Sequence, residues 1–93
     1  MTISKPNILF LDDEVRIVNA LQALFRADYH VFTATDPHTA LKIVKENTIH
    51  VVVSDQRMPE MLGVEVLRLI KEVSPRTMRL LLTGYSDIDG IVG

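Results

Sequence analysis

The chain has 93 residues, which is the size of one domain built around a single core. Apolar residues make up 47% of it, charged residues 24%, and the net charge is −2, a globular composition with no excess of positive charge to attract nucleic acid. The absence of cysteine excludes disulfides and thiolate metal sites, and no apolar run approaches the ~20 residues of a membrane helix. Because no secretory leader is visible either, we expect a cytoplasmic protein that contacts neither nucleic acid directly nor a membrane.

The first predicted element is a strand from Asn7 to Leu11, whose unbroken run ILFL is typical of a strand buried on both faces. Asp12, Asp13 and Glu14 follow it directly. The next stretch, from Glu14 to Arg26, has the spacing of an amphipathic helix. Its apolar stripe is predicted to face the core and consists of Ile17, Val18, Leu21, Leu24 and Phe25.

A second strand is predicted from His30 to Ala34, and a second helix begins just after it. Asp36 is a favoured N-cap residue, and Pro37 suits the first helical position because its missing N–H would have had no partner there. A third strand follows from Val51 to Ser54. The chain therefore repeats the pattern of a strand followed by a helix.

The third helix is predicted from Val64 to Val73 and the fourth strand from Arg79 to Leu82. The helix turns an apolar face inward that consists of Val66, Leu67, Ile70 and Val73. Because strands and helices alternate and crossovers are right-handed, the pattern predicts an α/β fold with a doubly wound parallel sheet. We expect the flavodoxin-like strand order 2-1-3-4.

Carboxylates follow two of these strands at the same edge of the sheet. Asp12 and Asp13 come after the first strand and Asp55 after the third, and the strand order makes these two strands neighbours. Like charges at about 4 Å repel by roughly 1 kcal/mol in water and about 4 kcal/mol near a protein surface. We therefore expect a cation in this acidic crevice, and a set of hard oxygen ligands favours Mg²⁺.

A purely structural interpretation of the acids is also open. Acidic residues at a helix N-terminus are stabilised by the helix dipole, which suffices for Glu14 and applies equally to Asp12 and Asp13. Asp55 could be a turn residue. The coincidence of acids after two strands with a hydroxyl, Thr83, after a third favours one shared site.

Three motifs resemble the receiver domain of two-component response regulators: LDDE after the first strand, VVVSDQRMPEMLGVEVL around the third, and LLLTGYSD after the fourth. Together they cover nearly the whole chain and are highly specific. The resemblance implies that Asp55 is the phosphoacceptor and that Asp12, Asp13 and Asp55 hold Mg²⁺ with the main-chain carbonyl of Arg57. It also implies that Thr83 is the switch hydroxyl that turns toward the phosphoryl group.

The resemblance further implies a phosphorylation-controlled signalling switch rather than an enzyme, with self-catalysed phosphotransfer and dephosphorylation as its only chemistry. This fits the residues, since a carboxylate is a competent nucleophile and phosphoryl transfer asks mainly for positioning and cations. The implied partner is a histidine kinase or phosphotransfer domain. It is expected to dock on the first helix, where Ile17 and Ala20 lie at the border of the buried stripe.

The sequence departs from the family pattern near its end. Receivers continue through a fifth strand and a fifth helix and carry a lysine at the end of that strand, and no lysine here follows a predicted strand. We therefore expect residues 1–93 to be a single receiver domain, truncated before the fifth strand, whose output domain is missing. The absent lysine is expected to impair the chemistry, and an uncovered fourth strand predicts possible self-association.

Other function classes fit the residues less well. No glycine-rich phosphate loop of the GxxxxGK type is present, which disfavours a nucleotide-binding enzyme. Arg57 stands where an aspartyl-phosphate phosphatase needs a second acid, and the acidic crevice would repel the phosphate of a flavin. The alternative that remains is a receiver-like interaction module that is never phosphorylated and acts only by binding a partner.

Overall fold

The computed structural model describes residues 4–82. Its strands are all parallel and lie in the order β2-β1-β3-β4, which confirms the predicted doubly wound α/β class. No helix within residues 4–82 is long and apolar enough to cross a membrane. In chain order the elements are β1 (Asn7–Leu11), α1 (Val15–Phe25), β2 (His30–Ala34), α2 (Pro37–Glu46), β3 (Val51–Asp55), α3 (Gly63–Val73) and β4 (Met78–Leu82).

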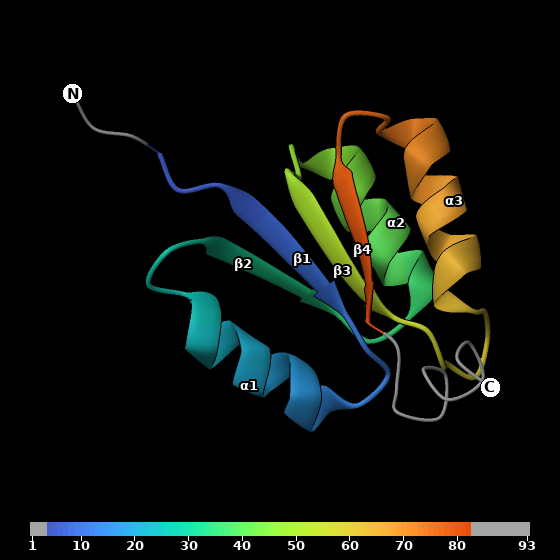
Figure 1. The fold of residues 1–93 in the computed structure, drawn as a ribbon, viewed down its shortest axis with the longest axis horizontal. Helices are drawn as coiled ribbons and strands as arrows, with labels where there is room; N and C mark the ends of the chain where they lie inside the picture. The colour runs from blue at the N-terminus through green and yellow to red at the C-terminus, as the bar shows by residue number, and fades with distance from the viewer. Residues whose placement is uncertain (1–3, 83–93) are drawn as a thin grey trace, which may run out of the picture.

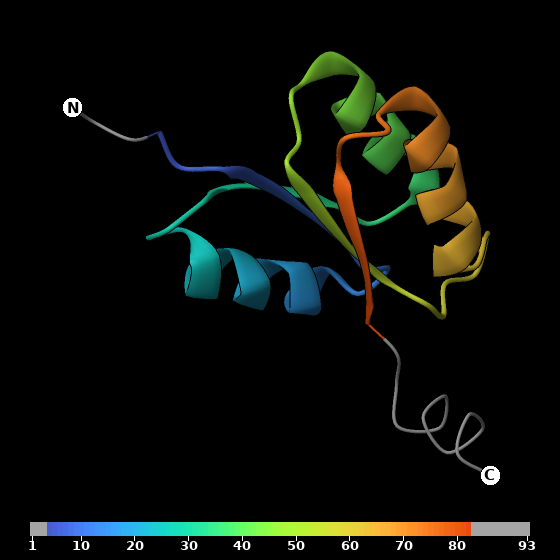
Figure 2. The same ribbon diagram turned by 45° about the horizontal axis from the view of Figure 1, so that its top comes forward.

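The helices form two layers around the sheet. α1 covers one face beside β2, while α2 and α3 lie together on the other face (Figures 1 and 2). β1 is buried along nearly its whole length and sends alternate side chains to the two layers. Leu9 and Leu11 join the core under α2 and α3, and Ile8 and Phe10 join the core under α1. The continuous apolar run of β1 therefore reflects a central strand with helices on both sides.

The predicted start of α2 is confirmed in atomic detail. The Asp36 carboxylate accepts hydrogen bonds from the Thr39 backbone N–H at 2.8 Å and from the Thr39 hydroxyl at 2.8 Å, and Pro37 is the first helical residue. Both contacts satisfy the helix N-terminus, whose first N–H groups have no partner within the helix. These bonds lower the pKa of Asp36 below its usual value, with the Thr39 N–H the largest cause.

Three of the predicted inward positions were wrong. Ile17 and Leu24 on α1 are 42% and 71% exposed, and Val73 at the end of α3 is 45% exposed. The core contact of α1 is narrower, with Val18 buried and Leu21 and Phe25 half-buried. Among the described elements α1 contacts only β1 and β2, so its flanks have nothing to pack against there. Val73 is the last residue of its helix, where the chain turns away toward β4.

Candidate functional site

The carboxyl ends of β1 and β3 bring three acids together. The two strands pair in parallel, with Phe10 beside Val53 and Leu11 beside Ser54, so the residues that follow lie at the same edge. One carboxylate oxygen from each of Asp12, Asp13 and Asp55 lies within 4.8 Å of the others. Asp13 is exposed, while Asp12 and Asp55 are half-buried. The structure thus gathers the three acids that the sequence analysis expected to meet.

Hydrogen bonds to the end of β2 and to the residue before α1 hold Asp12 in place. Its N–H donates to the Ala34 carbonyl on β2 at 3.2 Å, and its Oδ1 accepts from the Glu14 N–H at 2.9 Å. Burial raises the pKa of Asp12 above its usual value, and the negative charges of Asp55, Asp13 and Glu14 add to that rise against the Glu14 hydrogen bond. Burial and the neighbouring negative charges therefore both disfavour the ionised form of Asp12.

The backbone of Asp55 is in direct contact with the first residue of α3. A Cβ atom added to Gly63 would overlap the Asp55 carbonyl oxygen and would lie 2.8 Å from Leu81 Cδ1 and 3.0 Å from the Asp55 carbonyl carbon. Only glycine fits at this position without moving its neighbours. Gly63 therefore sets how closely α3 approaches Asp55.

Gln56 joins the ends of β3 and β4 to α3. Its N–H donates to the Leu82 carbonyl at 3.2 Å, its carbonyl accepts from the Gly63 N–H at 3.0 Å, and its Oε1 accepts from the Val64 N–H at 3.0 Å. The residue that precedes α3, Leu62, offers no side-chain cap, so Gln56 supplies it from the loop. The sequence analysis missed Gln56, because a cap from seven residues upstream leaves no local pattern.

Two further site residues were predicted from the sequence, Arg57 and Thr83. Arg57 is exposed in the loop after β3, and the part predicted for its main-chain carbonyl remains a prediction. The loop itself is anchored by Met58, which is buried in the core under α2 and α3. Thr83, the predicted switch hydroxyl, lies outside the described residues.

Comparison with known proteins decides the family. The model of the response regulator receiver domain matches residues 8–92. The chain belongs to this family. A receiver domain protein from Clostridium thermocellum of known structure is 36% identical, with a TM-score of 0.83 over 94% of this chain and 71% of that one. The family resemblance seen in the three sequence motifs is therefore confirmed.

Curated relatives of this receiver domain are longer regulators. The hydrogenase transcriptional regulatory protein HoxA of Bradyrhizobium diazoefficiens is 35% identical over 91% of this chain, and the transcriptional regulatory protein ZraR of Escherichia coli K12 is 37% identical over 99% of it. The chain spans only 18% and 21% of their lengths. Receiver domains are regulatory modules of two-component systems rather than enzymes, so this chain is part of a phospho-signalling switch.

Proposed function

We propose that Asp55 accepts a phosphoryl group from a histidine kinase, with Mg²⁺ held beside it, and that the resulting change controls an output domain of the same protein. The observation that supports this most is the meeting of Asp12, Asp13 and Asp55 at the carboxyl ends of β1 and β3 in a receiver domain. The greater length of the related transcriptional regulators supports the part about the output domain.

In the proposed transfer, a carboxylate oxygen of Asp55 attacks the phosphorus of a phosphorylated histidine. An O–P bond forms as the P–N bond breaks, the electron pair stays on the imidazole nitrogen, and that nitrogen then takes a proton from solvent. Water later attacks phosphorus, which releases inorganic phosphate and restores the carboxylate. Asp55 is suited to this role because it is half-buried at a strand end, and Gly63 fixes its backbone. Thr83 is proposed to donate its hydroxyl to the phosphoryl oxygens.

The three carboxylates fit a magnesium site. They offer hard oxygen ligands from two strand ends, and the raised pKa of Asp12 reflects the like charges around it, which a cation would compensate. Asp12, Asp13, Asp55 and the carbonyl of Arg57 are the proposed ligands. When bound, Mg²⁺ supplies positive charge for the phosphoryl oxygens in the transition state.

A small phosphodonor tests the acceptor without a kinase. The chain is incubated with acetyl phosphate and Mg²⁺, and the acyl phosphate is detected by intact mass and by its loss in hydroxylamine. We expect labelling of the wild type and none of Asp55→Asn. Asp36→Asn is the matched control, because it changes an acid at the same sheet edge and should leave labelling intact.

The outcomes separate the two candidate functions. Labelling that survives in Asp55→Asn would show that another residue is the acceptor. A wild-type chain that stays unlabelled with Mg²⁺ at saturating donor would favour the alternative of an interaction module that is never phosphorylated. Folding of each variant is checked by circular dichroism, so that loss of labelling is not confused with loss of structure.

The exposed flank of α1 is the proposed docking surface for the kinase or phosphotransfer domain. Ile17 is 42% exposed and Ala20 is exposed, and both lie on the helix that begins just after Asp12 and Asp13. An apolar surface beside the acceptor can seat a partner helix and bring its phosphohistidine to Asp55.

A charge on this flank tests the docking surface. We expect Ala20→Lys to slow phosphotransfer from the cognate kinase by about tenfold, which corresponds to 1.4 kcal/mol, and to leave acetyl phosphate labelling unchanged. Gln22→Lys, an exposed position on the opposite side of α1, is the matched control and should transfer at the wild-type rate. If Ala20→Lys reduces both reactions equally, α1 acts structurally and not as a docking surface.

A further inference from the structure

Gln56 lies in the chain between Asp55, the proposed phosphoacceptor, and Arg57, whose carbonyl is a proposed metal ligand. Both backbone groups of Gln56 are bound. Its N–H donates to the Leu82 carbonyl at the end of β4 at 3.2 Å, and its carbonyl accepts from the Gly63 N–H at 3.0 Å. Because peptide groups are planar, these bonds fix the orientation of the peptide before Gln56 and of the peptide after it.

The side chain of Gln56 makes a third hydrogen bond, to the first turn of α3. Its Oε1 accepts from the Val64 N–H at 3.0 Å, so the carbonyl and the side chain of one residue bind two successive N–H groups of the helix. These two bonds close residues 56–64 into a loop, and Met58, which is buried in the core under α2 and α3, anchors that loop from inside. The chain is therefore held on both sides of Arg57, at Gln56 and at Met58.

We propose that Gln56 is a positioning residue of the magnesium site, which through its bond to Val64 holds the Arg57 carbonyl at the acidic crevice. This role rests on the proposed function, because Arg57 is a ligand only in that proposal. Mg²⁺ demands near-ideal octahedral geometry at about 2.1 Å, so a main-chain ligand binds it less well when the loop that carries it is less firmly held. Groups that orient a metal ligand typically contribute about 10- to 100-fold to metal affinity.

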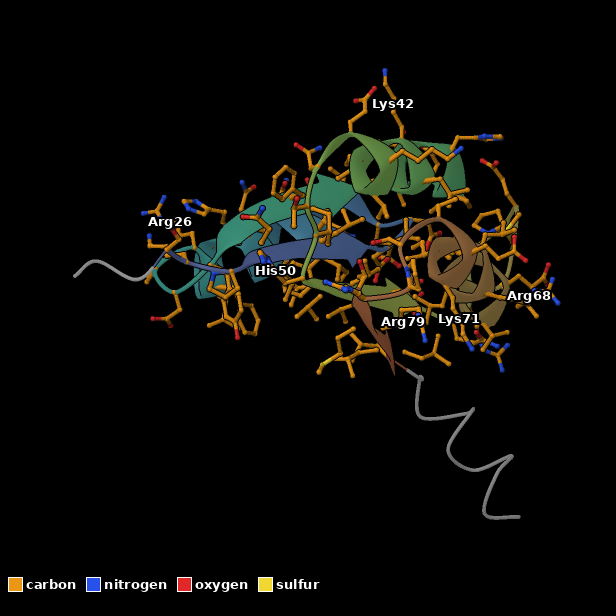
Figure 3. The ribbon with its side chains drawn as sticks, turned by 90° about the horizontal axis from the view of Figure 1, so that it is seen from above. Arg26, Lys42, His50, Arg68, Lys71 and Arg79 are labelled. Atoms are coloured by element: carbon orange, nitrogen blue, oxygen red, sulfur yellow. The ribbon has the colours of Figure 1, made fainter. Side chains whose placement is uncertain are left out.

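The body of α3 is held independently of the Gln56 side chain. It is anchored in the core under α2 and α3 by its buried residues Val66, Leu67 and Ile70. Arg68 points away from the sheet (Figure 3), and Val64, in the first turn, is 46% exposed. Loss of the bond from Gln56 is therefore expected to loosen the first turn of α3 and to leave the packed part of the helix in place.

Mg²⁺ titrations of the 93-residue chain, followed by isothermal calorimetry, test the role of Gln56. We expect Gln56→Met, which keeps the length of the side chain and removes the acceptor, to raise the dissociation constant for Mg²⁺ about tenfold. Gln56→Glu should bind Mg²⁺ at least as tightly as wild type, since a carboxylate oxygen accepts the same bond and a negative charge suits a helix N-terminus. Gln22→Met, the same change at an exposed glutamine of α1, is the matched control and should bind as wild type does.

A second substitution separates positioning from helix stability. Leu62→Ser places a hydroxyl at the N-cap of α3, three residues before Glu65, which is the arrangement of a capping box and involves no bond to residue 56. Added to Gln56→Met, it should restore the lost melting temperature but not the affinity for Mg²⁺. Recovery of both would show that the bond acts only through helix stability and would overturn the proposal. If Gln56→Met alone is unfolded, the double variant is compared with Leu62→Ser alone, and the same tenfold difference in affinity is expected.

The titrations also distinguish a failure of this role from a failure of the magnesium site. If the wild type and Gln56→Met bind Mg²⁺ equally tightly, the site stands and the role of Gln56 is overturned. If the wild-type chain binds no Mg²⁺, the site itself is overturned and the role of Gln56 with it. Weak binding by Gln56→Glu as well as by Gln56→Met would show that the bond to Val64 is not the cause, and would overturn the proposal too.

Discussion

Asp12 and Asp36 occupy similar places in the fold but are in opposite electrostatic states. Each follows a strand of the same parallel sheet and precedes a helix, and the two strands, β1 and β2, are neighbours. Two hydrogen bonds from Thr39 lower the pKa of Asp36. Burial and the surrounding acids raise the pKa of Asp12. Position at the ligand-binding edge of a sheet therefore does not by itself make an acid functional.

The difference lies in what compensates each negative charge. The negative charge of Asp36 is compensated within the chain, because the N-terminus of α2 supplies hydrogen-bond donors. The role of Asp36 is to cap the start of that helix. Among residues 4–82, the Asp12 carboxylate accepts one hydrogen bond, from the Glu14 N–H, and three other acids lie around it. We expect a bound cation to compensate the charge of Asp12, and the predictions below test this contrast in order of decreasing effect.

The largest expected effect is the response to Mg²⁺. We expect the cation to bind the folded acidic cluster and not the unfolded chain, and thereby to stabilise the fold by about 2.7 kcal/mol at a hundredfold excess over its dissociation constant. For a domain of this size that is a rise in melting temperature of roughly 10 °C or more. Thermal melts with and without the cation measure it.

The same thermal melts on variants distinguish the metal response of Asp12 from that of Asp36. Asp12→Asn and Asp55→Asn should lose most of the Mg²⁺-dependent rise, while Asp36→Asn should keep all of it. Equal melting temperatures of the wild-type chain with and without tens of millimolar Mg²⁺ would rule out the magnesium site. An equal loss in Asp36→Asn would mean that the cation responds to general surface charge.

A smaller effect is expected at Asp36 itself. Asp36→Ala should lower the free energy of unfolding by about 1 kcal/mol at neutral pH, the usual cost of removing an N-cap. Because the folded pKa of Asp36 is lowered, this stabilisation is present above the usual value of 3.8 and is lost as the pH falls through the lowered pKa. Denaturant unfolding at several pH values checks it, and a difference from wild type that grows on acidification would contradict it.

The smallest effect is expected for Asp12→Asn without metal. This variant should raise the free energy of unfolding, whereas Asp36→Ala should lower it. Because the folded pKa of Asp12 is raised, the native state holds the proton more tightly than the unfolded chain, so the free energy of unfolding falls as the pH rises from 3.8 through the raised pKa. The asparagine variant removes this pH-dependent loss of stability, and its side-chain oxygen can still accept the hydrogen bond from the Glu14 N–H. In the presence of a chelator it should be slightly more stable than wild type at neutral pH, and destabilisation there would contradict the contrast.

The sheet was predictable because short apolar runs mark its strands in the sequence. β1 and β2 begin and end at the predicted residues, and β3 and β4 differ from prediction by one residue each. A strand buried on both faces is apolar at nearly every position, as in β1 and in residues 51–53 of β3. The buried residues of α1 were less predictable, because the sequence gives the helical period but not how wide a face of the helix packs against other elements.

The acidic cluster was predictable for a related reason. Strand order and the parallel direction alone place Asp12, Asp13 and Asp55 at one edge. The contacts that support the site were harder to predict, since Gln56 binds the start of α3 through two hydrogen bonds and the end of β4 through a third. Such contacts depend on the path of the loop between two elements, and the pattern of residue types does not reveal that path.

The close approach of Gly63 to the Asp55 carbonyl couples the backbone of Asp55 directly to α3. Since no side chain lies between the two backbones, there is no rotamer change to absorb a displacement, and close-packed atoms transmit it directly. A shift of the Asp55 main chain would therefore press directly on the first residue of this 11-residue helix. A displacement at Asp55, the proposed acceptor, would therefore act first on the Gly63 end of α3 and not on its other end at Val73.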